Sequence, residues 1–163
     1  MAATTLLLLR HGIAEEPRAG LADGDRALTG RGRSRTRAVL ERLLALGLSA
    51  DGLLSSPLLR ARQTAEIAVE AGWAPELSLA AELAPEGAAL ACLPRWCEAC
   101  PGESLALVGH EPDLSGLAAS LIGAPAGRLD LRKAGLIQLR LTGAAAAGEA
   151  VLVSLLRPAL LLA

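Results

Sequence analysis

The segment Leu6-Leu7-Leu8-Leu9-Arg10-His11-Gly12 is the part of the sequence that decides the fold. Residues 4–9 are too few and too apolar for a helix and are typical of a strand buried on both faces of a parallel sheet. Arg10 and His11 follow this strand directly. In open α/β sheets ligands bind outside the carboxyl ends of the strands, so this pair is predicted to belong to a ligand site.

The second histidine has the same setting. The run Ser104-Leu105-Ala106-Leu107-Val108-Gly109-His110 is apolar and ends in Gly-His. The chain has 2 histidines in 163 residues, and they are His11 and His110. We therefore expect both imidazoles at the carboxyl ends of strands, on the same edge of one sheet.

The composition excludes several classes of function. The chain has 16 Lys and Arg against 17 Asp and Glu, so no global field favours nucleic acid or a membrane surface. It has no Tyr or Phe, and Trp73 and Trp96 offer little surface for stacking on bases. The core must therefore consist of Leu, Ala and Val. The length predicts one domain, residues 1–163, with a substantial core.

Targeting and metal-binding signals are weak in this chain. No apolar run approaches the roughly 20 residues that span a bilayer, and no basic segment precedes the first strand. We expect a cytoplasmic monomer with no membrane or nucleic-acid partner.

Cys92, Cys97 and Cys100 have the spacing C-x4-C-x2-C, but a zinc site usually needs four ligands and no histidine lies nearby in sequence. We interpret them as reduced thiols and expect no metal and no cofactor.

Strand and helix patterns alternate along the chain. Thr29 is a good N-cap residue, and Pro112 suits the first position of a helix. The expected helices cover 30–46, 58–71, 88–97 and 112–123, and the expected strands cover 4–9, 52–55, a short stretch near Leu77, 105–109, and a hairpin of 136–141 with 150–156. This order predicts an α/β fold with a mostly parallel central sheet, helices on both faces and a C-terminal hairpin.

Four nitrogen-bearing side chains are predicted to meet at one edge of the sheet. Three of them, Arg10, His11 and His110, follow strand ends. The fourth, Arg60, lies in the first turn of the helix after the second strand. Two guanidinium groups and two imidazoles would repel one another unless an anion joins them. The planar fork of arginine suits phosphate oxygens and helix N-termini add backbone donors, so the bound group is predicted to be phosphate or phosphoryl.

Hydrolysis of such a group, with no apparent metal cluster, needs a nucleophile from the protein. A neutral imidazole can attack phosphorus and form a covalent phosphohistidine, which splits one difficult step into two. The second imidazole can donate a hydrogen bond to the transferring group, and the two arginines can neutralise its equatorial oxygens.

These residues carry a resemblance to the histidine phosphatase superfamily, also called the phosphoglycerate mutase-like family. It rests, in this order, on Leu8-Leu9-Arg10-His11-Gly12, Leu28-Thr29-Gly30-Arg31-Gly32, Ser55-Ser56-Pro57-Leu58-Leu59-Arg60-Ala61-Arg62-Gln63-Thr64-Ala65 and Val108-Gly109-His110. The resemblance spans nearly the whole chain and implies the fold of that family. It also implies four roles: His11 as the nucleophile, Arg10 and Arg60 as phosphate ligands, and His110 as the residue that completes the catalytic pocket.

Two departures from the family pattern bear on the substrate. Members that act on phosphate esters usually carry Asn six residues after the nucleophile, where this chain has Pro17. They also carry an acidic proton donor in a Leu-x-Glu motif, and the corresponding stretch here is Leu83-Ala84-Pro85. Glu82 and Glu86 flank that stretch as candidate acids, but neither occupies the expected position. This pattern and the short chain resemble the SixA-type bacterial phosphohistidine phosphatases.

The missing acid has a chemical consequence. An alkoxide leaves reluctantly, because the pKa of water is about 15.7 and alcohols are comparable, whereas the pKa of imidazolium is about 6.5. A phosphoramidate therefore needs less help, and we expect the substrate to be a protein that carries phosphohistidine. One alternative is a phosphatase for a small phosphorylated metabolite, a sugar or nucleotide ester, with Glu82 or Glu86 as the acid. Another is a non-catalytic phosphate-binding module.

The first predicted helix is rich in arginine, at Arg31, Arg33, Arg35, Arg37 and Arg42. We interpret this series as a solvated helix face, because such charge runs commonly lie in solvent. The alternative interpretation is a docking surface for an acidic phosphoprotein.

Overall fold

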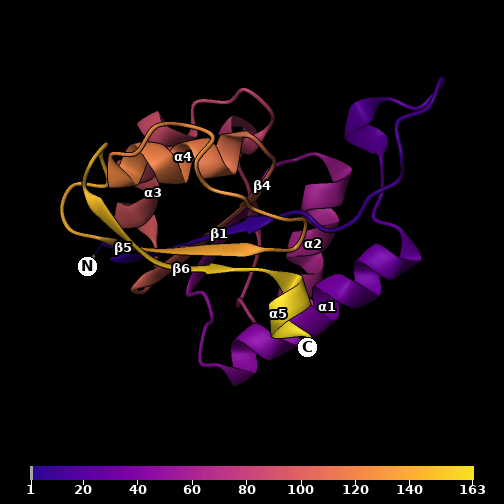
Figure 1. Ribbon diagram of the computed structural model, residues 1–163, viewed down its shortest axis with the longest axis horizontal. Helices are drawn as coiled ribbons and strands as arrows, with labels where there is room; N and C mark the ends of the chain where they lie inside the picture. Colours follow the sequence, from indigo (N-terminus) through magenta and orange to yellow (C-terminus); the bar gives the residue numbers. More distant parts are fainter. Residues whose placement is uncertain (1) are drawn as a thin grey trace.

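The structure, a computed structural model, describes residues 2–163 and contains a six-stranded sheet with helices on both faces (Figure 1). The strands are β1 (Thr5–Arg10), β2 (Gly52–Ser55), β3 (Ser78–Leu79), β4 (Ser104–Gly109), β5 (Leu136–Leu141) and β6 (Ala150–Leu156). The helices are α1 (Gly30–Ala45), α2 (Leu59–Glu70), α3 (Ala89–Ala99), α4 (Asp113–Ile122) and α5 (Pro158–Leu161), with short 3-10 helices η1 (Asp23–Asp25) and η2 (Ala81–Leu83). The predicted α/β class and the C-terminal hairpin are confirmed.

The order of the strands determines where the site lies. It runs β3-β2-β4-β1-β5-β6. The pairs β1–β4, β4–β2 and β2–β3 are parallel, whereas β5 is antiparallel to both β1 and β6. Leu9 of β1 and Ser55 of β2 both lie beside Val108 of β4 in the register. The carboxyl ends of these three strands therefore stop at the same level, which brings the residues that follow them together.

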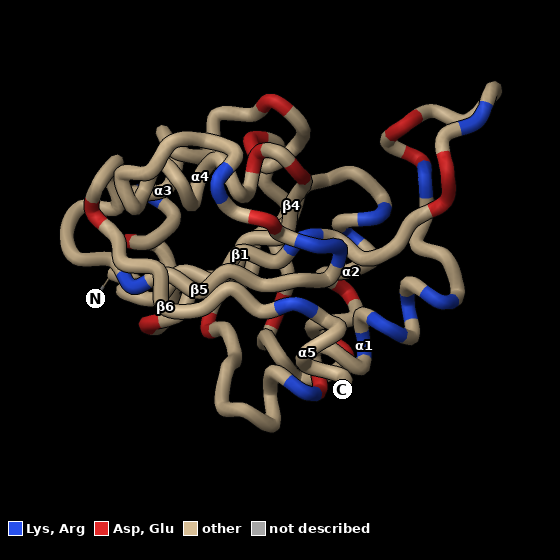
Figure 2. The backbone as a smooth tube through the Cα atoms, in the orientation of Figure 1, with Lys and Arg blue, Asp and Glu red and all other residues tan. Residues whose placement is uncertain are grey.

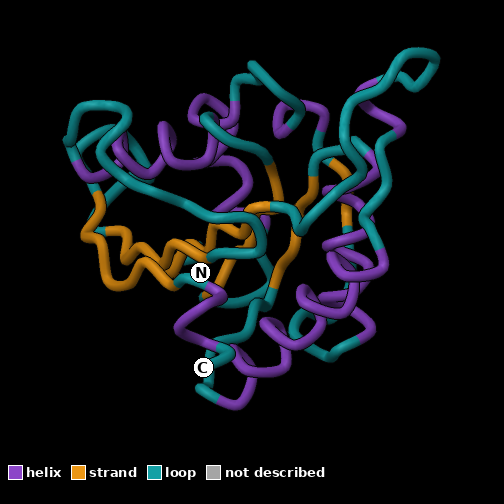
Figure 3. The backbone as a smooth tube through the Cα atoms, turned by 45° about the vertical axis from the view of Figure 1, so that its right-hand side comes forward, coloured by secondary structure: helices purple, strands orange, loops and turns teal. Residues whose placement is uncertain are grey.

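Alternating side chains of β1 contribute to two hydrophobic cores. Leu6 and Leu8 pack with residues of α3 and α4 on one face, and Leu7 and Leu9 pack with residues of α1 and α2 on the other. All four are at most 1% exposed. Burial of one leucine side chain contributes about 1.5–3 kcal/mol, so this strand stabilises both layers. Figure 3 shows helices on both sides of the strands.

Most predicted boundaries differ from the observed ones by one or two residues, and two of these differences have a clear physical reason. β1 ends at Arg10 and not at Leu9, because Arg10 pairs with Gly109 in the parallel ladder. Pro112 is the N-cap of α4 and not its first residue, since its φ and ψ of −85° and 6° are not helical and α4 begins at Asp113. The other predicted helices and strands differ from the observed ones only at their ends. Sequence patterns gave no signal for α5 or for the two 3-10 helices.

An arm formed by residues 12–28 joins β1 to α1 and projects from the rest of the molecule (upper right in Figure 1). Ala14 and Leu28 form an antiparallel bridge at its base. Thr29 then caps α1, as predicted, because its side chain accepts a hydrogen bond from the N–H of Gly32. η1 lies within this arm, and its contact with α2 is described below.

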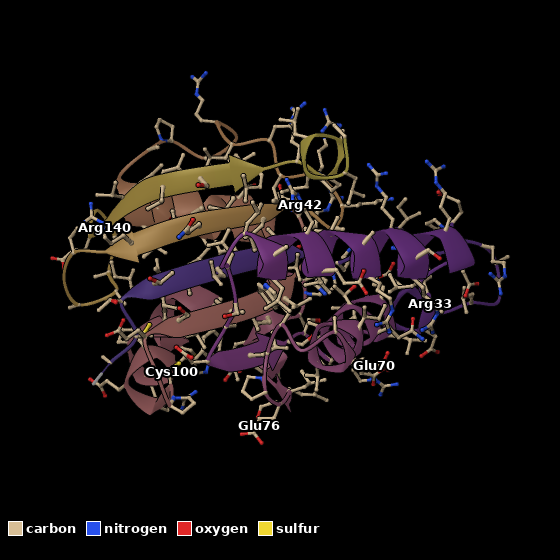
Figure 4. All side chains as sticks on the ribbon, turned by 90° about the horizontal axis from the view of Figure 1, so that it is seen from below. Arg33, Arg42, Glu70, Glu76, Cys100 and Arg140 are labelled. Atoms are coloured by element: carbon tan, nitrogen blue, oxygen red, sulfur yellow. The ribbon has the colours of Figure 1, made fainter. Side chains whose placement is uncertain are left out.

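The surface of α1 is basic, as the sequence predicts. Arg33 and Arg42 are exposed near opposite ends of this helix (Figure 4). Arg37 instead donates a hydrogen bond to Glu70 of α2 at 2.7 Å, which links the two helices. No helix within residues 2–163 has the combination of length and hydropathy that crossing a membrane requires.

Candidate active site

The carboxyl edge of the three central parallel strands brings two histidines together. His11 follows β1 and donates its backbone N–H to the carbonyl of Gly109, the last residue of β4, at 3.1 Å. His110 follows Gly109. The centroids of the two imidazole rings are 5.2 Å apart, and the ring planes are inclined by 54°. The predicted juxtaposition of His11 and His110 is therefore present.

The hydrogen bonds of the His11 ring determine its tautomer. Nδ1 lies 2.8 Å from the carbonyl oxygen of Gly12. A carbonyl oxygen only accepts, so Nδ1 carries the proton and Nε2 has the free lone pair. The Nε–H of Arg60 faces that lone pair at 3.4 Å. Nε2 is thus the basic nitrogen of the ring.

Burial keeps the His11 ring neutral. The side chain is only 7% exposed, and this burial is the main reason that the pKa of His11 is lowered to about 3. The carbonyl of Gly12 acts in the opposite direction, while His110, Arg60 and Arg10 lower the pKa further. At neutral pH, His11 is therefore an uncharged imidazole whose Nε2 lone pair accepts a hydrogen bond from Arg60, and an unprotonated nitrogen is what a nucleophile requires.

His110 is held by a serine that follows β2. Its Nε2 forms a hydrogen bond of 2.7 Å with the Oγ of Ser56, and the N–H of Leu58 donates to the same oxygen at 3.2 Å. Burial and then the charge of Arg60 lower the pKa of His110 to about 4, so it is neutral as well. Its Nδ1 is buried and has no hydrogen-bond partner among the described residues.

Arg60, in the first turn of α2, links the histidines to the arm. Besides its contact with His11, it donates to the backbone oxygen of Asp23 at 2.8 Å and to the carboxylate of Asp23 at 3.1 Å. The hydroxyl of Thr64 donates to the carbonyl of Arg60 and accepts from the N–H of Gly12. One threonine therefore ties the start of α2 to the turn that carries His11.

Arg10 is anchored on the other side of the site. It donates to the carbonyl of Leu131 at 2.9 Å, and its Nε is buried with no hydrogen-bond partner among the described residues. Burial lowers the pKa of Arg10, and the negative charge of Glu111 opposes this effect. Arg10 also lowers the pKa of both histidines, so the two guanidinium groups and the two imidazoles share one electrostatic environment.

The two candidate acids have different positions. A cavity of about 250 Å³ adjoins His110, and Glu82 and Asp113 are among its lining residues. Glu86 is absent from the lining of this cavity within residues 2–163. The N–H of Glu86 donates to the carboxylate of Asp113 at 2.8 Å. Glu82 therefore lines the cavity, whereas Glu86 contacts a lining residue, Asp113, through its backbone N–H.

Sequence reasoning assigned no role in the site to four of its residues: Ser56, Thr64, Asp23 and Asp113. Ser56 and Thr64 do lie within a quoted motif, and their closeness to Arg60 in sequence is a usable signal. Asp23 has no such signal, because its contact with Arg60 depends on how the arm folds.

The three cysteines lie away from these side chains. Cys92, Cys97 and Cys100 are free thiols of α3 and the residue that follows it. Burial raises the pKa of Cys97 to about 11, so its thiol stays protonated at neutral pH. Residues 2–163 contain no group of three or more His, Cys, Asp and Glu side chains that could hold a metal ion.

Paired imidazoles and two arginines, at the carboxyl edge of a sheet of this order, define a class of α/β phosphatases. The family model described as "Histidine phosphatase superfamily (branch 1)" matches residues 6–84, and the chain belongs to this superfamily. An uncharacterized protein of Picosynechococcus sp. is 49% identical over 144 residues, which cover 86% of each chain.

Solved structures share the fold over nearly the whole chain. The protein histidine phosphatase SixA complexed with tungstate has a TM-score of 0.82 and 23% identity, over 96% of this chain and 99% of that chain. A phosphoserine phosphatase mutant from Entamoeba histolytica has a TM-score of 0.73 and 18% identity, over 94% and 97%. These likenesses establish a phosphatase fold common to enzymes with different substrates.

Proposed function

We propose that this protein is a metal-independent phosphohydrolase that uses His11 as its nucleophile and removes the phosphoryl group from protein phosphohistidine. The observation that carries the proposal is the state of His11: Nδ1 is bonded to the carbonyl of Gly12, and the neutral ring presents Nε2. A buried imidazole in this state can attack phosphorus without first losing a proton.

The first step transfers the phosphoryl group to the protein. A bond forms between phosphorus and Nε2 of His11, and the bond from phosphorus to the leaving atom breaks. Arg10 and Arg60 neutralise the equatorial oxygens, and the N–H at Nδ1 of His110, which is buried and has no other partner among the described residues, donates a hydrogen bond to the transferring group. Fixed charges in a buried site are more effective here than in water, since they need no reorganisation.

The second step returns His11 to its starting state. Water attacks phosphorus, the bond to Nε2 breaks, and its electron pair returns to the ring. Inorganic phosphate leaves with the oxygen of water, and one proton is released to solvent or phosphate. Imidazole is a better leaving group than an alkoxide in this step, because the ordinary pKa of imidazolium is about 6.5.

The choice of a nitrogen-bound phosphoryl group rests on the residues at the expected acid position. Leu83 is buried in η2, and Ala84 and Pro85 follow it, so this stretch offers no proton donor. General acid catalysis commonly accelerates departure of a poor leaving group by roughly 10²- to 10⁴-fold. An imidazole leaving group needs that help least. The fold shared with a protein histidine phosphatase agrees with this choice.

The test compares substrates under one condition. Phosphate release is measured from a phosphohistidine protein and from sugar and aryl phosphate esters, with EDTA present and His11→Ala as the control. Preference for phosphohistidine supports the proposal. Full activity of the His11→Ala variant overturns it.

A phosphatase for small phosphate esters is the second candidate, because Glu82 lines the cavity beside His110. In that case Glu82 protonates the leaving oxygen. Glu82→Gln should then reduce ester hydrolysis at least about 10²-fold. Ester hydrolysis that is unaffected by this substitution excludes the second candidate.

A further inference from the structure

The cavity beside His110 has the position of a leaving-group site. It measures about 250 Å³ and is lined by His110 at one end, by Leu83 and Leu90, and by Leu117 of α4. The His110 ring is 5.2 Å from the His11 ring, so a phosphoryl group held between them adjoins the cavity. Whatever is attached to that group therefore has this space available.

The charge of the cavity is negative. Glu82 and Asp113 supply two carboxylates, and none of its described lining residues is Lys or Arg. Burial keeps His110 neutral, so it does not compensate them. Figure 2 shows acidic positions, in red, in the loops above the β4 label, with basic positions, in blue, on either side.

Each carboxylate has a partner that compensates its charge only weakly. The cation nearest to Glu82 is Arg95 at 3.8 Å, and the Arg95 side chain is 70% exposed, so solvent screens this pair. Asp113 accepts a hydrogen bond from the uncharged backbone N–H of Glu86. Both negative charges therefore remain available to a ligand.

The site is thus electrically divided. Arg10 and Arg60 make the phosphoryl side positive, while Glu82 and Asp113 make the cavity negative. His110 lies between the positive and negative sides, because it lines the cavity and is only 3% exposed. Its buried Nδ1 has no hydrogen-bond partner among the described residues, and a ligand bound beside it would provide one. The complementary ligand is an anionic phosphoryl group joined to a cation.

We propose that this cavity binds the protonated form of a nitrogen base, so that Glu82 and Asp113 select N-phosphorylated side chains over phosphate esters. This inference rests on the proposed function and deepens it. The protonated nitrogen base is attracted to the carboxylates, whereas an oxygen leaving group, which gains negative charge as its bond breaks, is repelled by them.

The balance of the transfer step explains why the charge matters. In a phosphoryl imidazolium, the ring nitrogen remote from phosphorus holds the proton. When Nε2 of His11 attacks, the P–N bond breaks and its electron pair returns to the substrate nitrogen, so neutral imidazole leaves. The proton stays on the remote nitrogen throughout. The carboxylates favour this protonated reactant, which has the better leaving group.

The test removes the charges and keeps the shape. Glu82→Gln, Asp113→Asn and the double variant are compared with wild type on a phosphohistidine peptide and on 4-nitrophenyl phosphate, whose leaving group bears no cation. Asparagine at position 113 keeps an oxygen for the N–H of Glu86. Glu41→Gln, on the exposed surface of α1, is the matched control.

We expect the double variant to lose about tenfold or more in kcat/KM for the phosphohistidine peptide. Its kcat/KM for 4-nitrophenyl phosphate should stay the same or rise, because the repulsion of the leaving oxygen is removed. Equal losses on both substrates, or an unchanged ratio between them, overturn the inference and leave the His11 mechanism intact. Wild-type protein with no His11-dependent release from either substrate overturns both. If the Asp113 variants unfold, the same comparison is made with Glu82→Gln alone, because the Glu82 side chain makes no hydrogen bond within the described residues.

Discussion

The Nδ1 atom of His11 lies 2.8 Å from the carbonyl oxygen of its neighbour Gly12. The acceptor belongs to the backbone, so no side-chain substitution elsewhere removes it while the turn is intact. The proton therefore stays on Nδ1, and Nε2 stays available at the carboxyl edge of the sheet. The predictions below concern the residues that contact Nε2 or hold the phosphoryl group beside it.

Arg60→Lys should lower kcat/KM for 4-nitrophenyl phosphate by about 10²-fold, since lysine cannot reproduce the planar fork that reaches both His11 and Asp23. Steady-state kinetics measure the effect. Arg62→Lys is the control, because Arg62 is half exposed and its one ion pair within residues 2–163 is with Glu66 of the same helix. Wild-type kinetics in the Arg60 variant would show that Arg60 does not contact the phosphoryl group.

Asp23→Asn should strengthen inhibition by inorganic phosphate by about three- to tenfold. The Asp23 carboxylate lies 3.1 Å from Arg60 and reduces the positive charge available to an anion. Asparagine keeps an acceptor for Arg60 but removes the competing charge. The inhibition constant for phosphate is the measurement, and Asp25→Asn, an exposed neighbour in η1, is the control. Weaker inhibition in the Asp23 variant would contradict this role.

The free energy of unfolding should decrease as the pH falls from about 6.5 towards 4. The pKa of His11 is lowered to about 3 and that of His110 to about 4, mainly by burial, against an ordinary value of 6.5. In this window the unfolded chain binds protons that the folded chain excludes, so acid favours unfolding. We expect a loss of about 2 kcal/mol for each histidine, roughly 4 kcal/mol in all, by pH 5, measured by urea denaturation.

His110→Asn checks the source of that pH dependence. It leaves one of the two histidines of the chain, so the slope of stability against pH between 7 and 5 should become clearly smaller. An unchanged slope would assign the effect to other groups.

Ser56→Ala should lower kcat/KM by about tenfold, because the hydroxyl of Ser56 positions His110 at 2.7 Å. Ser55→Ala is a matched control: Ser55 is equally buried, and its hydroxyl donates to the carbonyl of Ser56 without touching a histidine. Ser56→Ala removes two hydrogen bonds, with Nε2 of His110 and from the N–H of Leu58, and Ser55→Ala removes one, so the Ser56 variant should be the less stable of the two. Equal activities of the two variants would show that Ser56 has only a structural role.

The parts of the site that lie next to strand ends could be predicted from the sequence. Parallel strands of a sheet end at one edge, so the residues that follow β1 and β4 had to meet once both runs were identified. Arg60 is close in sequence to β2 and was located for the same reason. The Leu6–Leu9 run similarly predicted a strand buried on both faces.

The remainder depends on contacts that no local pattern records. Asp23 meets Arg60 across 37 positions, through an arm whose path is determined by packing. Asp113 reaches the loop at Glu86 from the first turn of α4, across 27 positions. The start of α4 was misplaced by one residue because proline is compatible with both the N-cap and the first helical position.

The central claim is a covalent bond between phosphorus and His11, and trapping the phosphorylated protein tests it most directly. Wild-type protein is mixed with a phosphohistidine substrate, quenched in alkali within milliseconds to seconds, and mapped by peptide mass spectrometry. Alkali is used because protonation of the nitrogen in acid promotes loss of the phosphoryl group. We expect a phosphoryl group on His11 in the wild type and none in His11→Asn, which should also release no phosphate. A phosphoryl group on another residue, or turnover by the His11 variant, would contradict it.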